Sequence, residues 1–252
     1  MSFAEELRVA IEAAEAGGAA ALARFRRPVG VWKKTDASPV TEADLASEAA
    51  ILGAIERTFP DDGFMSEESG ERPAANGRRW LVDPIDGTLA FLRGLPHWGV
   101  LVAFESGGRV EAGVAHFPAL ATTYAAASGE GCWRNGERVR CSDVASFPAA
   151  TIQIGEAASI RERDPRLFDA IIGSGATIRC YGDAYAACLV LDGRSDGWIE
   201  CARTWDFAPF AVLAREAGAR FTDWSGAESI DGGTAILATP RLHDLLRALV
   251  SP

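Results

Sequence analysis

The chain has 252 residues, a length that suits one large domain or two halves packed tightly together. Hydrophobic residues make up 48% and charged residues 24% of it, a composition that excludes a disordered or low-complexity protein. The 25 Lys and Arg against 35 Asp and Glu give a formal charge of −10, and no long basic run is present, so we expect no nucleic-acid partner.

The amino-terminal part of the chain is expected to be helical. The spacing of apolar residues predicts an amphipathic helix from Phe3 to Phe25, ended by Pro28. A polar, turn-like segment follows at residues 33–40, and Thr41 is the expected N-cap of a helix that runs to about Phe59. The first residues lack the basic start and apolar block of a signal peptide, and no stretch approaches the roughly 20 apolar residues of a membrane span. We therefore expect no export signal and no membrane partner.

Strands are expected in the next hundred residues. A short strand at Gly63–Ser66 is followed by a buried strand at Trp80–Val82, which should end at Asp83-Pro84 because proline cannot donate to the sheet. Three β-type runs between His97 and Ala127 fit an antiparallel meander, and Asn135-Gly136 marks a hairpin turn.

Beyond about residue 145 strands and helices alternate, which is typical of an α/β half. The expected elements are strands at Thr151–Ile154, Thr177–Arg179 and Trp198–Cys201, helices at Pro165–Ile172, Asp183–Leu191 and Asp206–Ala217, short strands near Phe221 and Ile236, and a helix after Pro240. We expect two halves, residues 1–144 and residues 145–252, with a cleft between them.

The sequence contains no pattern that indicates a catalytic cysteine or histidine. The five cysteines are widely spread and form no Cys-x-x-Cys pair, so we expect reduced thiols in a cytoplasmic protein. None has a histidine at catalytic spacing. We interpret His97, His116 and His243 as structural, because no partner motif accompanies them.

The densest chemical signal is the run Trp80-Leu81-Val82-Asp83-Pro84-Ile85-Asp86-Gly87-Thr88. Its two carboxylates, three residues apart, suit Mg2+, which prefers oxygen ligands and keeps several waters. The backbone N–H groups of Gly87 and Thr88, at the expected start of a helical turn, suit a phosphate oxygen. Without context the same Asp-Pro-x-Asp-Gly pattern is also that of a common surface turn.

Further acids lie on either side of this run. Glu67 and Glu68 precede it by a short loop, and Asp206 stands far downstream in Trp205-Asp206-Phe207-Ala208. Taken alone, Asp206 would be a helix N-cap and Glu67 a solvated loop charge.

In combination, three segments resemble the inositol monophosphatase-like family of metal-dependent phosphatases, and the resemblance extends over nearly the whole chain. They are Phe64-Met65-Ser66-Glu67-Glu68-Ser69, Trp80 to Thr88, and Trp205 to Ala208, in that order. We therefore expect an α+β fold, a layered α-β-α-β-α sandwich with an N-terminal antiparallel-sheet half and a C-terminal α/β half.

The resemblance implies a two-metal centre. Glu67, Asp83 and the carbonyl of Ile85 would hold one Mg2+, while Asp83, Asp86 and Asp206 would hold a second, with Asp83 bridging. Such cations, roughly 4 Å apart, steady the entering and leaving oxygens of an in-line displacement and activate a water. Some relatives imply a third, weaker Mg2+ near Glu67, which is therefore a candidate catalytic residue as well.

The segment Lys34 to Asp44 also looks like the family, in which the equivalents of Asp44 and Thr88 pair and orient the attacking water. The structural alternative is that Asp44 completes a capping box with Thr41, and one residue can serve both purposes. For Glu68, metal ligation and a supporting or solvated role both stay open. The chain departs from the family at Leu89-Ala90-Phe91, where relatives usually carry an Asn two residues after the threonine, so the support behind the turn is in doubt.

The run Arg179-Cys180-Tyr181-Gly182-Asp183-Ala184-Tyr185 resembles the Arg-x-x-Gly-Asp-x-Tyr run of the histidinol-phosphate phosphatase branch. Inositol-specific relatives generally have a small hydroxyl residue or Ala where Asp183 stands. In a cleft Asp183 would pair with a substrate amine or imidazolium, and the alternative is that it caps a helix. Glu200 lies near the family's substrate-side acid, one residue closer to the Trp-Asp motif, and Arg179 would contact phosphate or a neighbouring subunit.

These observations predict a Mg2+-dependent phosphate monoesterase that hydrolyses histidinol phosphate, a reaction of histidine biosynthesis, with a water as nucleophile. One alternative is an inositol-1-phosphatase or a broad sugar and polyol phosphatase. Another is a non-catalytic binding module of the same fold, against which the intact acid set argues. Because the family commonly forms dimers, we expect a homodimer.

Overall fold

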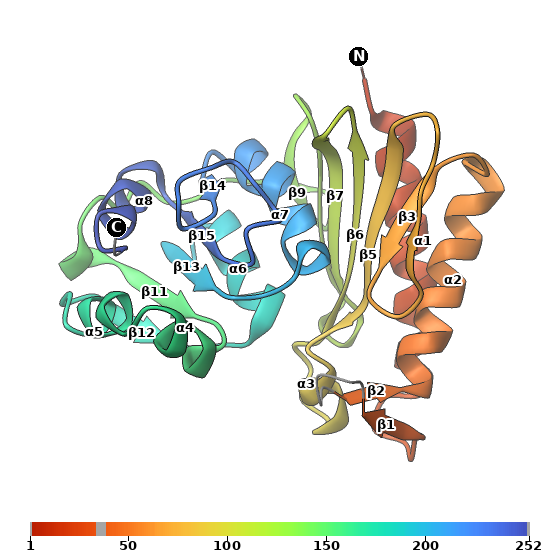
Figure 1. Ribbon diagram of the computed structural model, residues 1–252, viewed down its shortest axis with the longest axis horizontal. Helices are drawn as coiled ribbons and strands as arrows, with labels where there is room; N and C mark the ends of the chain where they lie inside the picture. The colour runs from red at the N-terminus through yellow and green to blue at the C-terminus, as the bar shows by residue number, and fades with distance from the viewer. Residues whose placement is uncertain (1, 34–38, 251–252) are drawn as a thin grey trace.

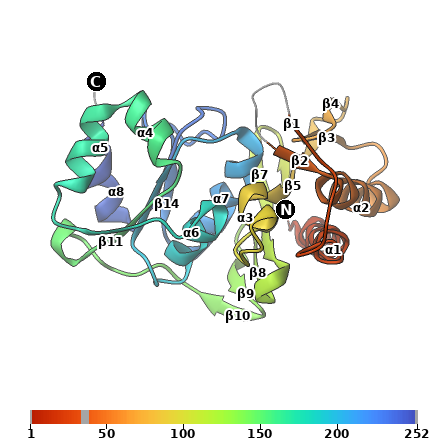
Figure 2. The ribbon, with the colours of Figure 1, turned by 90° about the horizontal axis from the view of Figure 1, so that it is seen from below.

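The computed structural model describes residues 2–33 and 39–250, and its helices and sheets alternate in five layers (Figure 1). Two sheets are separated by a pair of helices, and further helices cover the outer face of each sheet (Figure 2). This arrangement confirms the expected α-β-α-β-α sandwich.

The first outer layer consists of α1 (Ala4–Leu22) and α2 (Glu42–Thr58). Their apolar faces pack with the large sheet, where Trp80 is fully buried. A Cβ at Gly17 of α1 would lie 2.5 Å from Cγ1 of Ile51 on α2, so only glycine permits this close approach of the two helices. Thr41 caps α2 as expected. The turn-like segment expected at residues 33–40 falls mostly outside the described residues, between the short paired strands β1 (Val31–Lys33) and β2 (Pro39–Thr41).

The large sheet has the strand order β10-β9-β8-β7-β6-β5-β3-β4. Its strands are β3 (Gly63–Ser66), β4 (Gly70–Arg72), β5 (Arg78–Asp86), β6 (Gly99–Ser106), β7 (Arg109–Phe117), β8 (Thr122–Ala127), β9 (Gly131–Arg134) and β10 (Glu137–Val139). Only β3 and β5 run parallel to each other, and the expected meander is confirmed. Asn135 and Gly136 form the hairpin turn, with φ of 49° and 80°.

The prediction that the buried strand ends at Asp83-Pro84 is wrong. Strand β5 continues to Asp86, and its pairing with β6 shifts register between Asp83 and Asp86. Proline is tolerated at such an irregularity because its missing N–H interrupts no regular ladder there. Both aspartates are thereby carried to the end of the sheet, where α3 (Thr88–Leu92) begins.

The smaller sheet has the order β12-β11-β13-β15-β14. Its strands are β11 (Thr151–Ile154), β12 (Thr177–Arg179), β13 (Gly197–Glu200), β14 (Arg220–Thr222) and β15 (Ala235–Ala238), close to the expected ranges. The first three strands of this order are parallel, whereas β15 is antiparallel to both neighbours. The larger sheet comes entirely from residues before 145 and the smaller from residues after it, while the domain boundary itself stays a prediction.

Helices α6 (Asp183–Leu191) and α7 (Thr204–Ala217) fill the space between the sheets. On the outer face of the smaller sheet lie α4 (Ala157–Arg163), which the sequence pattern did not predict, α5 (Pro165–Ile172) and α8 (Pro240–Arg247). Short 3₁₀ turns occur at Pro118–Leu120 and Phe147–Ala149. Among the described helices, none is long and apolar enough to cross a membrane. All five cysteines are free.

Candidate active site

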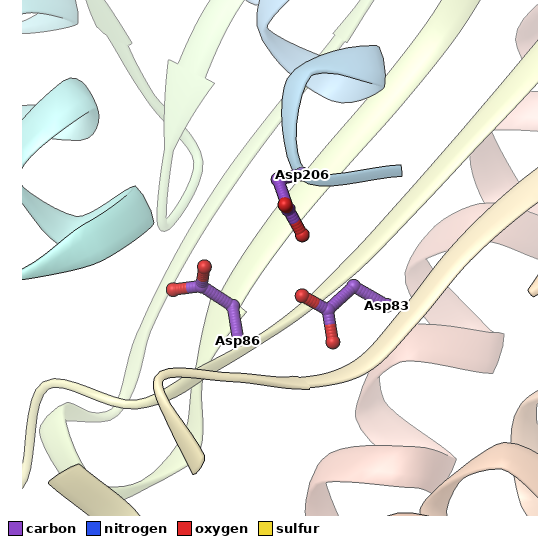
Figure 3. Close-up of side chains that lie close together, drawn as sticks. All are labelled: Asp83, Asp86 and Asp206. Atoms are coloured by element: carbon purple, nitrogen blue, oxygen red, sulfur yellow. The ribbon is translucent and has the colours of Figure 1, made fainter. Parts of the chain in front are cut away.

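Three aspartates from two distant parts of the chain meet at one point between the two halves. Asp83 and Asp86 lie at the end of β5, and Asp206 lies in the first turn of α7; their carboxylates face a common space (Figure 3). One carboxylate oxygen of each lies within 4.8 Å of the others. The structure thus brings together three of the four acids predicted to bind metal through their side chains.

Backbone amides hold the first two aspartates in place. Oδ1 of Asp83 accepts a hydrogen bond from the N–H of Ile85 over 3.0 Å, inside the irregular end of β5. Oδ2 of Asp86 accepts one from the N–H of Ala184 over 3.0 Å, at the start of α6. Both side chains are almost fully buried, and the carboxyl of Asp83 also contacts that of Asp206.

Asp206 combines a structural contact with its place in the cluster. Its Oδ2 accepts a hydrogen bond from the N–H of Arg203, the residue at which α7 is capped, over 2.7 Å. The expectation that Asp206 is the N-cap is wrong, because Arg203 is the N-cap and Asp206 lies three residues further on. Its capping-box contact with Arg203 still supports the helix start, and its carboxylate also faces Asp83. Asp206 can have both roles, in the capping box and in the aspartate cluster, because the first turn of α7 points toward Asp83 and Asp86.

The pKa values of the three aspartates show that their negative charges are unfavourable in this buried place without a cation. Burial, with added repulsion from Glu67, raises the pKa of Asp83 well above its ordinary value. Burial and the charge of Asp183 do the same to the pKa of Asp86. Burial raises the pKa of Asp206 to about 6. Buried, mutually repelling carboxylates are the donor set that a hard divalent cation with oxygen ligands would relieve, so these residues fit Mg2+.

Glu67 borders the same space but is not a member of the group of three. It follows β3, and its N–H donates to the carbonyl of Val82 over 3.2 Å. Because β3 and β5 are parallel and Ser66 pairs with Val82, Glu67 follows β3 at the level of Asp83 on β5. The charge of Glu67 contributes to the raised pKa of Asp83, of Asp206 and of Asp44.

Asp44 makes both of the contacts that the sequence left as alternatives. Its Oδ2 accepts hydrogen bonds from the N–H and hydroxyl of Thr41 over 2.8 and 2.6 Å, which completes the capping box. Its Oδ1 lies 3.4 Å from the hydroxyl of Thr88, which also reaches the carbonyl of Ile85 over 3.2 Å. Burial raises the pKa of this carboxyl above its ordinary value.

The cavity at this point has a volume of about 250 Å3. Its lining consists of Glu67, Asp83, Ile85, Asp86, Gly87, Thr88, Glu156, Asp183, Ala184, Trp198, Glu200, Cys201, Ala202 and Asp206. Apart from Asp44 and Arg179, every predicted metal, phosphate and substrate residue is in that set. A larger cavity of about 760 Å3 beside α8 contains none of them, so the smaller cavity is the candidate site.

Gly87 and Asp183 lie against each other in the cavity wall. Gly87 has a φ of 76° and leads into α3 at Thr88. A Cβ at Gly87 would lie 2.9 Å from Oδ2 of Asp183. The N-cap of α6 is Gly182, and Asp183 is the first residue of the helix. The capping alternative for Asp183 is therefore wrong in this structure, and its carboxylate is directed to the cavity.

Glu200 ends β13 as a buried acid. Its Oε1 accepts hydrogen bonds from the N–H groups of Glu156 and Cys201, each over 2.8 Å, and burial raises its pKa to about 8. A Cβ at Gly155 would lie only 1.5 Å from Oε2 of Glu200. Sequence reasoning missed Gly155 and Glu156, because neither belongs to a motif and both follow a short strand.

Two residues considered at the sequence level lie outside this lining. Arg179 is exposed at the end of β12, and its Nη1 donates to the carbonyl of Ile178 over 2.7 Å. Glu68 is half-buried, and its N–H donates to Glu48 over 3.3 Å.

The model of the inositol monophosphatase family matches residues 3–251. A histidinol-phosphatase of Chlorobaculum parvum is 37% identical over 236 residues, covering 92% of this chain and 91% of that protein. The Nus factor SuhB of Pasteurella multocida is 33% identical over 245 residues, covering 94% and 92%. A solved structure, the IMPase of Thermotoga maritima, matches with a TM-score of 0.87 at 31% identity over 97% and 96% of the two chains.

Proposed function

The chain belongs to the inositol monophosphatase family and is a phosphatase, and we propose that it is a Mg2+-dependent histidinol-phosphate phosphatase. One observation carries the choice of substrate. The lining of the cavity that holds the aspartate cluster includes two further acids, Asp183 and Glu200, called here the second acidic wall. Because burial raises the pKa of Glu200 to about 8, Glu200 keeps its proton at neutral pH unless a cation binds beside it. Such a wall suits a phosphate ester whose other end is cationic.

The aspartate cluster supports the metal assignment. Glu67, Asp83 and the carbonyl of Ile85 would hold one Mg2+, and Asp83, Asp86 and Asp206 the second, with a third at Glu67 as the weakest. When bound, such cations supply positive charge that offsets the phosphoryl oxygens and help a water to lose its proton.

Thr88 and Asp44 would orient the attacking water. The Thr88 hydroxyl has one proton, which it would donate to Oδ1 of Asp44 in place of the carbonyl of Ile85 when that carbonyl binds the metal. The lone pairs of its oxygen would then accept a hydrogen bond from the water. Asp44 is itself fixed by its two contacts with Thr41. The nucleophile would then be held in line with the phosphorus, which lowers the entropic part of the barrier.

The backbone N–H groups of Gly87 and Thr88 would bind a phosphate oxygen at the start of α3. The left-handed backbone at Gly87 supports this role, because it turns the chain from β5 into the helix beside the aspartates.

The substrate cation would lie against the second acidic wall. Asp183 adjoins Gly87, so a group bound there is next to the phosphate position. A charge-assisted hydrogen bond from an amine or imidazolium to Asp183 is worth about 1.5–3 kcal/mol. Arg179 has no contact with the cavity in this conformation, so a role for it in phosphate binding requires its side chain to move.

A substrate panel tests the proposal. Release of inorganic phosphate from histidinol phosphate, inositol 1-phosphate and a sugar phosphate would be measured with Mg2+ and after EDTA treatment. We expect histidinol phosphate to have the highest kcat/KM. A preference for inositol 1-phosphate, the alternative that the match to the Thermotoga maritima IMPase favours, would replace the substrate assignment. If none of the three esters is hydrolysed with Mg2+, the alternative of a non-catalytic binding module would replace the proposal.

We further propose a cytoplasmic homodimer. The five free cysteines support a reducing compartment. Leu89 and Leu95, large apolar side chains exposed on and after α3, support a contact surface near the active site. Light scattering on the purified protein would give the number of subunits, and a monomer at micromolar concentration would contradict the dimer.

A further inference from the structure

Helix α2 directs three buried polar side chains toward the candidate active site. They are Asp44, Ser47 and Glu48, spaced i, i+3 and i+4 and thus on one face of the helix. Asp44 reaches Thr88, as described above, and the hydroxyl of Ser47 donates to the carbonyl of Pro84 over 2.8 Å. The face is rigidly placed, because Gly17 lets α1 pack directly against it.

Glu48 makes the largest number of these contacts. Its carboxylate accepts hydrogen bonds from the hydroxyls of Ser66 and Ser69 and from the N–H groups of Glu68 and Ser69, the last two over 3.3 and 3.0 Å. The residue is 5% exposed, so these contacts are shielded from water. Both carboxylate oxygens accept hydrogen bonds from the same turn, residues 66–69.

Glu67 lies in the middle of the turn that Glu48 holds. Ser66 on one side and Glu68 and Ser69 on the other are bound to Glu48, while the N–H of Glu67 is bound to Val82 of β5. Its backbone is therefore fixed from both directions, which determines where its side chain can point.

We propose that Glu48 is a positioning residue for the metal centre: it holds the turn at residues 66–69 so that the carboxylate of Glu67 faces Asp83. The inference rests on the metal centre of the proposed function. Groups that orient a metal ligand typically change metal affinity by about 10–100-fold when they are removed. Glu48 acts only through Glu67, since it has no place in the lining of the cavity.

Calorimetric titration of Mg2+ into metal-free Glu48→Gln protein tests the proposal. Gln keeps the size of the side chain but presents an amide where the turn needs two acceptor oxygens, so we expect Mg2+ binding to weaken about tenfold or more. Glu56→Gln is the matched control, because Glu56 is on the same helix and contacts Arg72 of β4 over 2.5 Å, on the same hairpin but away from Glu67. The control should bind Mg2+ like the wild type.

A double-mutant cycle separates positioning from a general loss of stability. Once Glu67→Gln has removed the ligand, adding Glu48→Gln should weaken Mg2+ binding no further, although it would still lower the melting temperature in EDTA. Additive losses of Mg2+ affinity, or an unchanged affinity in Glu48→Gln, would overturn the proposal. If Glu48→Gln does not fold by circular dichroism, Ser66→Ala/Ser69→Ala carries the same test, because it removes two donors and leaves Glu48 intact. A wild-type protein that binds no Mg2+ would refute the metal centre itself.

Discussion

The backbone N–H of Ala184 donates a hydrogen bond to Oδ2 of Asp86 over 3.0 Å. This contact joins the first turn of α6, in the second half of the chain, to a member of the aspartate cluster in the first half. The preceding residue, Asp183, consequently lies beside Gly87 and in the same cavity. The expected metal position and the expected position of the substrate cation are thus linked by one backbone contact.

The acid cluster predicts how the metal-free protein responds to pH. The pKa of Glu200 is raised to about 8 and that of Asp206 to about 6, both through burial, so the folded state holds protons that the unfolded state releases near pH 4. The stability from these protons is present at low pH and is lost as pH rises through the folded-state values. Thermal unfolding in EDTA should therefore show a falling melting temperature between pH 6.5 and 8.5.

Two histidines contribute in the opposite sense, mainly below this window. Burial lowers the pKa of His243 to about 4 and also lowers the pKa of His116, so the stability they contribute is lost as pH falls through the ordinary histidine value near 6.5. Saturating Mg2+ should reduce the slope between pH 6.5 and 8.5, because the cation replaces protons on Asp83, Asp86 and Asp206. The contribution of Glu200, which is not a proposed metal ligand, should stay. A melting temperature that rises with pH in EDTA would show that the folded state does not hold these protons.

Thr88→Ala should lower kcat much more than it changes KM. The Thr88 hydroxyl is expected to orient the water and not to bind the ester, so its loss removes an interaction made only in the transition state. Steady-state kinetics on histidinol phosphate provide the measurement, and Thr88→Ser, which keeps the hydroxyl, should recover most of kcat. Equal kcat in the Ala variant and the wild type would leave Thr88 as a turn residue.

Asp183→Asn should change substrate choice with little effect on stability. Gly182, and not Asp183, is the N-cap of α6, and Asn keeps the size of the side chain, so the helix start should survive the substitution. We expect kcat/KM for histidinol phosphate to fall about tenfold, equivalent to about 1.4 kcal/mol, while hydrolysis of inositol 1-phosphate stays nearly constant. If both esters lose activity equally, Asp183 acts on the shared phosphate site and not on the cation.

Gly155→Ala should displace Glu200. The added Cβ would lie 1.5 Å from Oε2, so the carboxylate must leave its two N–H donors, and KM for histidinol phosphate should rise. Gly53→Ala is the matched control, since its Cβ would have only the tip of Arg57 nearby, 4.0 Å away. In the interior of α2 that change should stabilise the protein by about 0.4–1 kcal/mol without affecting KM. An unchanged KM in Gly155→Ala would remove Glu200 from the substrate site.

Local sequence patterns predicted much of this fold because they report local interactions. The capping box of α2 lies within four residues of chain, and the turn at Asn135-Gly136 is fixed by the backbone preferences of those two residues. The three acidic motifs could be found for the same reason, since each is a short run of residue types. The family to which the motifs pointed is confirmed, and so is the phosphatase class.

Contacts between segments that are far apart in the chain could not be predicted from such local patterns. The irregular register that lets β5 run past Pro84 depends on how β6 pairs with it, and pairing is not encoded in either strand alone. The antiparallel placement of β15 beside β13 is likewise a property of the chain path. Glu48 belongs to no chemical motif. Its role could not be predicted, because it depends on α2 packing against the turn that carries Glu67.

The dependence of hydrolysis on Mg2+ and on Asp83 tests the central claim most directly. Phosphate release from histidinol phosphate should be absent in EDTA-treated protein and should return when Mg2+ is added. Asp83→Asn should remain folded, because it relieves repulsion within the cluster, yet turn over about a hundredfold more slowly or worse, because it removes the shared ligand. Full activity in metal-free buffer, or wild-type turnover by Asp83→Asn, would contradict the account.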